Sequence, residues 1–182
     1  MKPAKLPSAL VAVSALWANG CGAPPNLPAG DEACRAPTLV QVLDFVDGDT
    51  ADVRFLEGTL SGDEERIRLI GVDTPEINHS DTASSECYGV MAWNEAAELL
   101  DDREAWLSYD AQCQDFFGRT LAYMSRSSDL FFLNEHLVAE GFGRALSIPP
   151  SDHFGEEFAA LEVAAQEQAR GLWGEPCYGS TR

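Results

Sequence analysis

Lysine is almost missing from this sequence. The only lysines among the 182 residues are Lys2 and Lys5, and the other ten basic residues are arginines. Because 30 residues are Asp or Glu, the formal net charge is -18, which argues against a protein that holds nucleic acid through a broad basic surface. An enzyme that binds phosphate at one small basic site is not excluded. Arginine suits such a site, although a compositional bias or a salt-adapted surface explains its predominance more simply.

Long hydrophobic runs are missing as well. The apolar run over residues 9–18 is too short to span a bilayer as a helix. With lysines before it and small residues after it, this run predicts a signal peptide over residues 1–20, and therefore export from a bacterial cell. Cys21 resembles the lipidated first residue of a bacterial lipoprotein, so we expect a membrane anchor at Cys21 or plain secretion, with a cytoplasmic chain as the remaining alternative. Residues 21–37, rich in Pro, Gly and Ala, are expected to form a tether.

Cysteines are few, and their spacing lacks the close pairs of a zinc site. Besides Cys21 there are four: Cys34, Cys87, Cys113 and Cys177. An even number in an oxidising compartment suggests two disulfides, for which three pairings are possible. The pairing that we favour joins Cys34 to Cys177, which would tie the ends of the domain, and Cys87 to Cys113, which would tie two central loops.

The length suits a single domain, and 45% apolar residues predict a packed core. Residues 39–46 and 51–55 have the composition and alternation of strands, and the turn residues between them predict a hairpin. A third strand is expected over residues 66–72, and its apolar residues on both faces favour a small barrel. Apolar residues recur at helical spacing over residues 92–100 and 158–172, where Gly171 is placed to end the helix. With a shorter helix over residues 134–141, the pattern predicts an α+β fold whose sheet is a five-stranded barrel.

Three segments concentrate residues that can do chemistry: Asp47–Thr50, Arg68–Glu76 and Asp115–Tyr123. The first is typical of a tight turn, and its two carboxylates alone are too few for a calcium cage. In the second, Pro75 breaks a strand, so the polar residues around it leave the sheet at its rim. In the third, Gly118 allows a close approach of the backbone. Each segment taken alone is more typical of an ordinary turn or charged loop than of a site.

Together and in this order, the three segments resemble those of the staphylococcal nuclease, or thermonuclease, family. That family has an Asp-Gly-Asp-Thr turn, an Arg followed five residues later by Asp-Thr-Pro-Glu, and a downstream Asp-x-Tyr-Gly-Arg. The likeness extends from about residue 40 to residue 173, through Cys87-Tyr88-Gly89, Asn134-Glu135 and Gly171-Leu172-Trp173. It implies an OB-fold barrel with three helices, which we place over residues 38–176, with a tail over residues 177–182.

The resemblance also implies an activity, Ca²⁺-dependent endonucleolytic hydrolysis of DNA and RNA to products that end in 3′-phosphate, by a monomer. It makes Asp49 and Asp73 the carboxylate ligands of Ca²⁺, with the backbone carbonyl of Thr74 as a third oxygen. Glu76 would orient or deprotonate the attacking water. Two further pairs complete the expected site: Arg68 and Arg119 on the scissile phosphate, and Asp115 and Phe117 at the nucleotide.

Several positions depart from the family pattern. The best-known member has Lys and Tyr where this chain has Phe116 and Phe117, and it has two tyrosines in the stretch that matches residues 141–150, which contain none. These departures bear on substrate preference, and Phe117 retains the ability to stack on a base. His79, in a loop that also differs, is expected to be solvated rather than a ligand. The alternatives to an enzyme are a non-catalytic binding module of the same fold and a calcium-binding surface lipoprotein.

Overall fold

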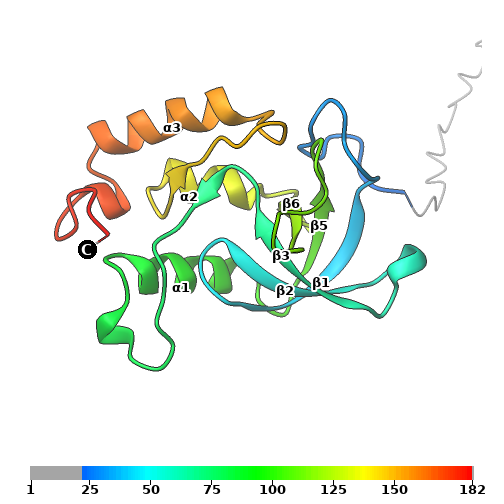
Figure 1. Ribbon diagram of the computed structural model, residues 1–182, viewed down its shortest axis with the longest axis horizontal. Coiled ribbons are helices and arrows are strands. Elements are labelled where there is room, and N and C mark those ends of the chain that lie inside the picture. Colours follow the sequence, from blue (N-terminus) through cyan, green and yellow to red (C-terminus); the bar gives the residue numbers. More distant parts are fainter. Residues whose placement is uncertain (1–21, 182) are drawn as a thin grey trace, which may run out of the picture.

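The computed structural model describes residues 22–181, so the expected signal peptide and the lipidation site at Cys21 lie outside the described residues. A closed five-stranded barrel forms one half of the molecule, and helices are stacked beside it in the other half (Figure 1). The strands and helices are β1 (Thr38–Phe45), β2 (Thr50–Phe55), β3 (Glu64–Leu69), β4 (Val72–Asp73), α1 (Gly89–Leu100), β5 (Glu104–Ser108), β6 (Thr120–Arg126), α2 (Leu133–Ala139), β7 (Arg144–Ala145) and α3 (Gly155–Glu167).

The barrel closes in the order β1-β2-β3-β6-β5, with β5 paired back onto β1. All neighbours are antiparallel except β3 and β6, which run parallel. Buried and more exposed side chains alternate along much of β1, β2 and β3, as for strands with one face in the core, whereas most residues of β5 and β6 are buried. The buried residues that fill the barrel include Val40, Val42, Val53, Ile67, Leu107 and Met124. The expected hairpin of residues 39–46 and 51–55 is therefore confirmed as β1 and β2.

The three α-helices pack on one side of the barrel, with α2 between α1 and α3 (Figure 1). In this layer α2 contributes the buried Leu133 and Leu137, and α3 contributes the buried Phe158. The expected α+β fold, a five-stranded barrel with three helices, is confirmed.

Two expected boundaries are wrong. The third strand ends at Leu69 rather than at residue 72, because Gly71 has a φ of +83° and turns the chain out of the barrel. Val72, the last residue expected in that strand, instead forms the short strand β4 with Asp73, and β4 pairs with β7. The last helix ends at Glu167 because Ala169 has a φ of +49°, and Gly171 opens a separate short 3-10 turn.

The disulfides join Cys34 to Cys113 and Cys87 to Cys177, so the pairing that we favoured from the sequence is wrong. The path of the chain explains the difference. Cys34 lies beside the loop after β5, where its amide donates to the Asp110 carbonyl at 2.8 Å, and the Cys87 amide donates to the carbonyl of Thr181 at 3.0 Å. Each end of the domain is therefore tied to the loop nearest to it, and not to the other end.

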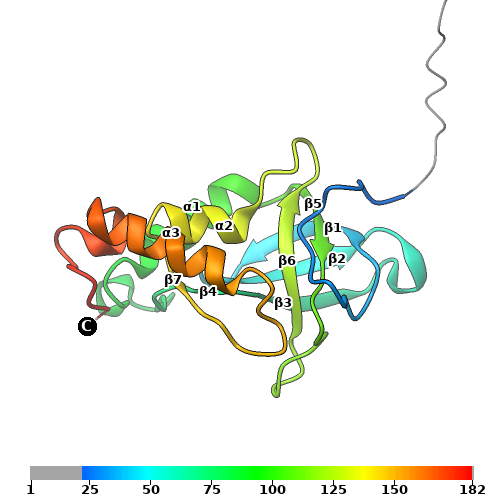
Figure 2. The same ribbon diagram turned by 90° about the horizontal axis from the view of Figure 1, so that it is seen from above.

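The segment expected to be a tether contacts the barrel over the part that the structure describes. The amide of Gly30 donates to the Tyr109 carbonyl at 3.0 Å, and the Ser108 hydroxyl bonds to the carbonyl of Pro28. Figure 2 shows this segment running alongside the barrel. Within residues 22–181, none of the helices is long and apolar enough to cross a membrane.

Candidate active site

The turn between β1 and β2 holds Asp49 in a buried position. The Asp47 side chain accepts a hydrogen bond from the Asp49 amide at 3.0 Å, which shapes the turn. A Cβ atom on Gly48 would lie 2.8 Å from the Thr74 side chain and 3.0 Å from that of Ala92, so a larger residue would push the turn away from its neighbours. As a result, the Asp49 carboxylate is only 4% exposed and points at the rim of the barrel.

The register of the barrel brings Arg68 to this carboxylate. Arg68 in β3 is paired with Thr50 in β2, directly after Asp49. The Nη1 atom of Arg68 lies 2.7 Å from Asp49 Oδ1, and its Nη2 atom lies 3.0 Å from Asp73 Oδ1. Arg68 Nη1 also donates to the Val72 carbonyl at 2.8 Å. One guanidinium therefore holds two carboxylates that are far apart in the sequence.

The strand break at Pro75 positions the second half of the site. The amide of Thr74 donates to Asp49 Oδ2 at 2.7 Å, and its hydroxyl lies 3.1 Å from the same oxygen. Thr74 is buried, whereas the Asp73 side chain is 55% exposed and faces solvent beyond the Arg68 guanidinium. The two carboxylates thus flank one point at the rim, one from the interior and one from the surface.

Glu76 lies in the same acidic group, and its backbone is held by the segment before α1. The Glu76 amide donates to the Glu86 carboxylate at 3.1 Å, and the Glu86 amide donates back to the Glu76 carbonyl at 3.0 Å. Gly89, the first residue of α1, packs so closely on this backbone that a Cβ atom would lie 2.4 Å from the Glu76 carbonyl oxygen. The position of Glu76 therefore depends on the same segment that carries the Cys87 disulfide.

Electrostatics makes the site a region of crowded negative charge. Burial raises the pKa of Asp49 to about 7, and the Arg68 guanidinium opposes that rise. The pKa of Glu76 is also raised, first by burial and then by the charges of Asp47, Glu86 and Asp73. Carboxylates with raised pKa values are typical of functional sites. A cation at this place would relieve the repulsion among them.

Arg119 is presented by the loop between β5 and β6. Its Nε atom lies 2.6 Å from Asp115 Oδ2, and the backbone amides of Arg119 and Phe117 both donate to Asp115 Oδ1 at 2.9 Å. Gly118, with a φ of +82°, allows the tight turn between them. Burial opposes ionisation of Asp115, but the hydrogen bonds from Arg119 and from the Phe117 amide outweigh it and lower the pKa of Asp115.

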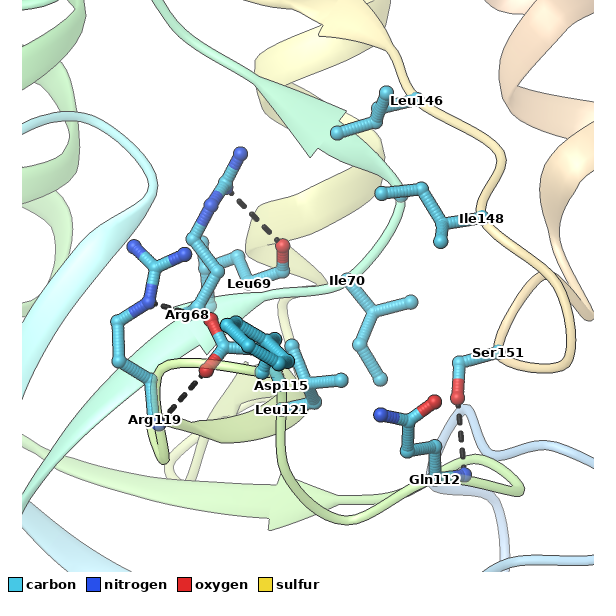
Figure 3. A pocket seen from close by; sticks show the side chains of 12 residues that line it. Arg68, Leu69, Ile70, Gln112, Asp115, Arg119, Leu121, Leu146, Ile148 and Ser151 are labelled. Carbon is cyan, nitrogen blue, oxygen red and sulfur yellow. Dashed lines mark hydrogen bonds and ion pairs between the residues drawn. The ribbon is translucent and has the colours of Figure 1, made fainter.

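A cavity of about 360 Å³ at the rim is lined by both arginines. In Figure 3 the guanidinium groups of Arg68 and Arg119 lie together on one side of it, and Leu146 and Ile148 lie on the other. Parallel pairing places Arg68 opposite Leu121, two residues after Arg119, which explains why the two guanidinium groups lie on the same side of the cavity (Figure 3). The cavity therefore has two arginines, each paired with an acidic side chain, at one side and apolar side chains at the other, a combination that suits a nucleotide.

The donor set at the rim fits a hard divalent cation. Ca²⁺ binds carboxylate and carbonyl oxygens and completes its shell with water, and Asp49, Asp73 and the carbonyl of Thr74 are donors of this kind. Among residues 22–181 no cluster of three or more His, Cys, Asp or Glu side chains is arranged to hold a metal. The expected set, with two carboxylates, lies below that number, and its third ligand would come from the backbone.

Most of the expected site residues form two contacting groups, whereas the Glu76 amide contacts Glu86. Asp49, Arg68, Asp73 and Thr74 are in direct contact, as are Asp115 and Arg119. Phe117 joins the second group through the bond of its amide to Asp115, but its ring lines a different cavity, which Arg119 also lines. The exposed His79 lies with its Nε2 atom 2.6 Å from the Val46 carbonyl oxygen, away from these contacts.

Sequence reasoning missed other residues. The charge of Asp47 helps to raise the pKa of Glu76. The cavity is also lined by Gln112, Phe116, Leu146, Ile148 and Ser151. Phe116 and Asp47 stand inside the motif segments, and Ile148 lies in the stretch of residues 141–150 where the family pattern has tyrosines, so all three had a signal.

Known proteins of one family are similar to this chain over most of its length. Residues 66–175 match the family model described as staphylococcal nuclease homologue. The thermonuclease of Staphylococcus intermedius is 35% identical over 128 residues, which cover 70% of this chain and 71% of the relative. The thermonuclease of Staphylococcus hyicus is 33% identical over 133 residues, covering 73% and 74%. An uncharacterized protein of Methanocaldococcus jannaschii is 30% identical over 152 residues, covering 73% and 70%. The chain therefore belongs to the staphylococcal nuclease family.

Proposed function

We propose that this protein is a Ca²⁺-dependent nuclease that hydrolyses phosphodiester bonds in DNA and RNA and leaves 3′-phosphate ends. The observation that carries the proposal is the contact of Arg68 with both Asp49 and Asp73, at 2.7 and 3.0 Å. It brings a guanidinium and two carboxylates to one point, at the edge of a cavity that Arg119 also lines, and these groups suit a phosphate and a cation. Two similar proteins are named thermonucleases, which agrees with this proposal.

Asp49, Asp73 and the Thr74 carbonyl would hold the cation. When bound, Ca²⁺ supplies positive charge beside the phosphate oxygens that become negative in the transition state. The hydrogen bond from the Thr74 amide to Asp49 Oδ2 fixes the buried carboxylate before substrate arrives. Such preorganisation means that little has to rearrange during the reaction.

Arg68 and Arg119 would bind and orient the scissile phosphate. Their guanidinium groups lie on the same side of the cavity (Figure 3). A guanidinium can donate two parallel hydrogen bonds to phosphate oxygens, which Arg68 would do once a cation displaces it from Asp49. Guanidinium does not give up its proton in proteins. We therefore assign to both residues the stabilisation of charge, and we leave the proton for the departing 5′ oxygen to water.

Glu76 would act on the attacking water. Its raised pKa makes it a better proton acceptor than an ordinary surface glutamate. The exposed carboxylate stands on a backbone clamped to Glu86, so it can hold a water molecule in a fixed direction. Whether the proton transfers fully to Glu76 or is only directed by it, removing the carboxylate should slow the chemical step.

The proposal is tested with purified protein, single-stranded DNA and Ca²⁺. We expect cleavage that a chelator abolishes and that falls by at least about 10²-fold in Glu76→Gln and Arg119→Ala, the range for loss of one group acting in the transition state. Glu157→Gln, on the exposed face of α3, is the matched control and should retain full activity. Calcium binding without any hydrolysis would contradict the proposal and favour a calcium-binding surface lipoprotein.

We further propose that the protein works outside the cytoplasm as a monomer, either lipidated at Cys21 or secreted. The two disulfides support the first part, because structural disulfides persist in oxidising compartments. Mass spectrometry of the mature amino terminus separates the two forms of export, since a lipidated Cys21 carries the added mass of its acyl chains.

A further inference from the structure

Two neighbouring phenyl rings are exposed at the tip of the loop between β5 and β6. Phe116 is 96% exposed and Phe117 is 81% exposed. Figure 2 shows this loop projecting beyond the strands of the barrel. Isolated apolar side chains on a surface need no explanation, but paired aromatic rings beside a binding site indicate a contact surface for a ligand.

The loop presents these rings from a fixed backbone. The Asp115 carboxylate accepts hydrogen bonds from the Phe117 amide and from both the amide and Nε of Arg119. Two residues before Asp115, Cys113 is tied by its disulfide to Cys34. The rings are thus exposed without being attached to a loose segment, and less conformational entropy is lost when a ligand stacks on them.

The two rings face different spaces. Their centroids are 5.9 Å apart and their planes are nearly perpendicular, at 84°. Phe116 lines the 360 Å³ cavity of the site, whereas Phe117 lines a second cavity of about 400 Å³ that is bordered by Arg66. Arg119 lines both cavities, and its guanidinium carbon lies 5.7 Å from the centre of the Phe117 ring. Arg119 therefore stands at the boundary between two half-sites that each contain one exposed ring.

We propose that Phe116 and Phe117 stack on two successive bases, one on each side of the phosphate that Arg119 binds. This inference rests on the proposed function and deepens it: the substrate is single-stranded nucleic acid with unpaired bases on both sides of the bond that is cut. Bases in a duplex are already stacked on both faces and cannot receive either ring. Because stacking does not depend on the identity of the base, the two rings select for an unpaired strand and not for a sequence.

Nucleic acid fits this surface better than a lipid membrane does, although exposed phenyl rings are also found at membrane surfaces. The formal net charge of -18 repels anionic headgroups and a nucleic-acid strand alike, so overall charge does not decide between them. The local arrangement does, because a single strand places one phosphate between two bases, which matches one arginine between two rings. Arg119 lines both cavities, and this observation favours a nucleic-acid strand as the ligand.

The test uses thymidine dinucleotide, whose single phosphodiester fixes the register, and two versions that lack the 5′ or the 3′ base. Stacking is worth about 1–3 kcal/mol per base, or roughly 5- to 150-fold in affinity. We therefore expect Phe116→Ala and Phe117→Ala each to lower kcat/KM on the complete dinucleotide by roughly that factor. On the substrate without the 5′ base, one variant should cleave as fast as the wild type does, and the other should keep its defect. On the substrate without the 3′ base, the two variants should exchange these behaviours.

Matched variants separate stacking from general disturbance. Phe116→Tyr and Phe117→Tyr keep an aromatic face and should retain most of the activity, whereas leucine at either position should not. Val163→Ala removes an apolar side chain that is 52% exposed on α3, and it should change nothing. Defects of both alanine variants that vanish on the same substrate, or no defect in either variant, would overturn the inference.

Failure of the inference can be told apart from failure of the proposed function. The affinity for the dinucleotide is also measured by NMR titration in a chelator, where no cleavage occurs. If the wild type binds with the expected pattern but never cleaves, the two-base site stands and the nuclease proposal fails. If the wild type cleaves and the phenylalanine variants are unaffected, only the inference fails. Phenylalanine-dependent binding to vesicles of phosphatidylcholine and phosphatidylglycerol, with cleavage unaffected, would assign the rings to a membrane instead.

Discussion

Arg68 lies 2.7 Å from the buried carboxylate of Asp49, and both side chains are largely withdrawn from solvent. Arg68 therefore neutralises the charge of the residue that we propose as the inner ligand of Ca²⁺. The same guanidinium also contacts Asp73. A cation that binds to both aspartates competes with part of this contact. The guanidinium released from Asp49 would then be available to a phosphate.

Removal of Arg68 should separate stability from catalysis. In Arg68→Ala the buried Asp49 loses its partner, so we expect the free energy of unfolding without Ca²⁺ to fall by about 3–5 kcal/mol, as for a broken buried ion pair. Saturating Ca²⁺ should raise the free energy of unfolding of Arg68→Ala by more than it raises that of the wild type. The reason is that in the variant no guanidinium competes with the cation for the aspartates. Cleavage should stay at least about 10²-fold below wild type even when Ca²⁺ saturates the site.

Thermal unfolding with and without Ca²⁺ measures the stability effect of Arg68→Ala, and steady-state kinetics measures the catalytic effect. Arg54→Ala is the matched control, because Arg54 pairs with Glu64 at 2.6 Å on the exposed face of the barrel. An exposed pair contributes at most about 1 kcal/mol, and no activity should be lost. Equal effects of the two substitutions would contradict the role given to Arg68.

The hydroxyl of Tyr123 should matter far more than that of Tyr178, although each lies 2.6 Å from a carboxylate. Tyr123 is fully buried and donates to the buried Asp110, and burial together with this bond raises the Tyr123 pKa. Tyr123→Phe leaves a buried acceptor with one donor fewer, which costs about 1–3 kcal/mol of unfolding free energy. Tyr178→Phe, at a residue 68% exposed, should change it by less than about 0.5 kcal/mol. Chemical denaturation of both variants checks this, and comparable losses would refute it.

Each disulfide should support a different part of the proposed reaction. Replacing either pair by alanine should cost about 2–5 kcal/mol of stability. Loss of the Cys87–Cys177 bond loosens the segment that holds the Glu76 backbone, so kcat should fall more than KM rises. Loss of the Cys34–Cys113 bond loosens the loop that presents Arg119, so KM should rise more. Steady-state measurements of kcat and KM, made below the unfolding temperature of both variants, check this prediction. Identical effects of the two replacements on kcat and KM would contradict it.

Acid should loosen the loop that carries Arg119. The pKa of Asp115 is lower in the folded protein than its usual value of 3.8, because hydrogen bonds from Arg119 and from the backbone outweigh burial. The ionised carboxylate therefore stabilises the fold at pH values above about 4. This contribution is lost as the pH falls through the lowered folded pKa. Hydrogen exchange at the amides of Phe117 and Arg119 should accelerate, relative to intrinsic rates, between about pH 5 and pH 2 in the wild type.

Asp115→Asn should remove most of the acid response of the loop, since its side chain cannot titrate. Asp63→Asn, at an exposed residue in the turn before β3, is the control and should leave the response intact. A loop that loosens equally in acid with Asn at position 115 would show that another group controls it.

Salt should not weaken cleavage of long DNA at first. Without residues 1–20 the chain has ten arginines, no lysine and 30 acidic residues, a formal charge of -20. Repulsion from a polyanion reaches about 30 Å at 0.01 M salt and about 8 Å at 0.15 M. Screening should therefore relieve repulsion more than it weakens two close arginine contacts, so the rate should rise or stay level over this range. A rate that falls steeply with salt would contradict this, and a dinucleotide substrate serves as the control with little repulsion.

The motifs carry much of the candidate site. Asp49, Arg68, Asp73 and Arg119 could be named as candidates because the three motif segments, in this order, resemble those of the staphylococcal nuclease family. The barrel and its helices were also predictable, since alternation and helical spacing are local properties of the chain. The end of β3 at Leu69 was not, because Val72 continues the apolar pattern after the turn at Gly71.

The sequence by itself determined the family, the kind of fold and the chemical groups of the site. Only the tertiary structure decided that Arg68 bridges two carboxylates, that Phe116 and Phe117 face two cavities, and which cysteines pair across 79 and 90 residues. The physical reason is the distance along the sequence between the residues that determine each feature. Turns and periodicity are encoded within a few residues, whereas a contact between distant segments depends on the path of the whole chain around the barrel.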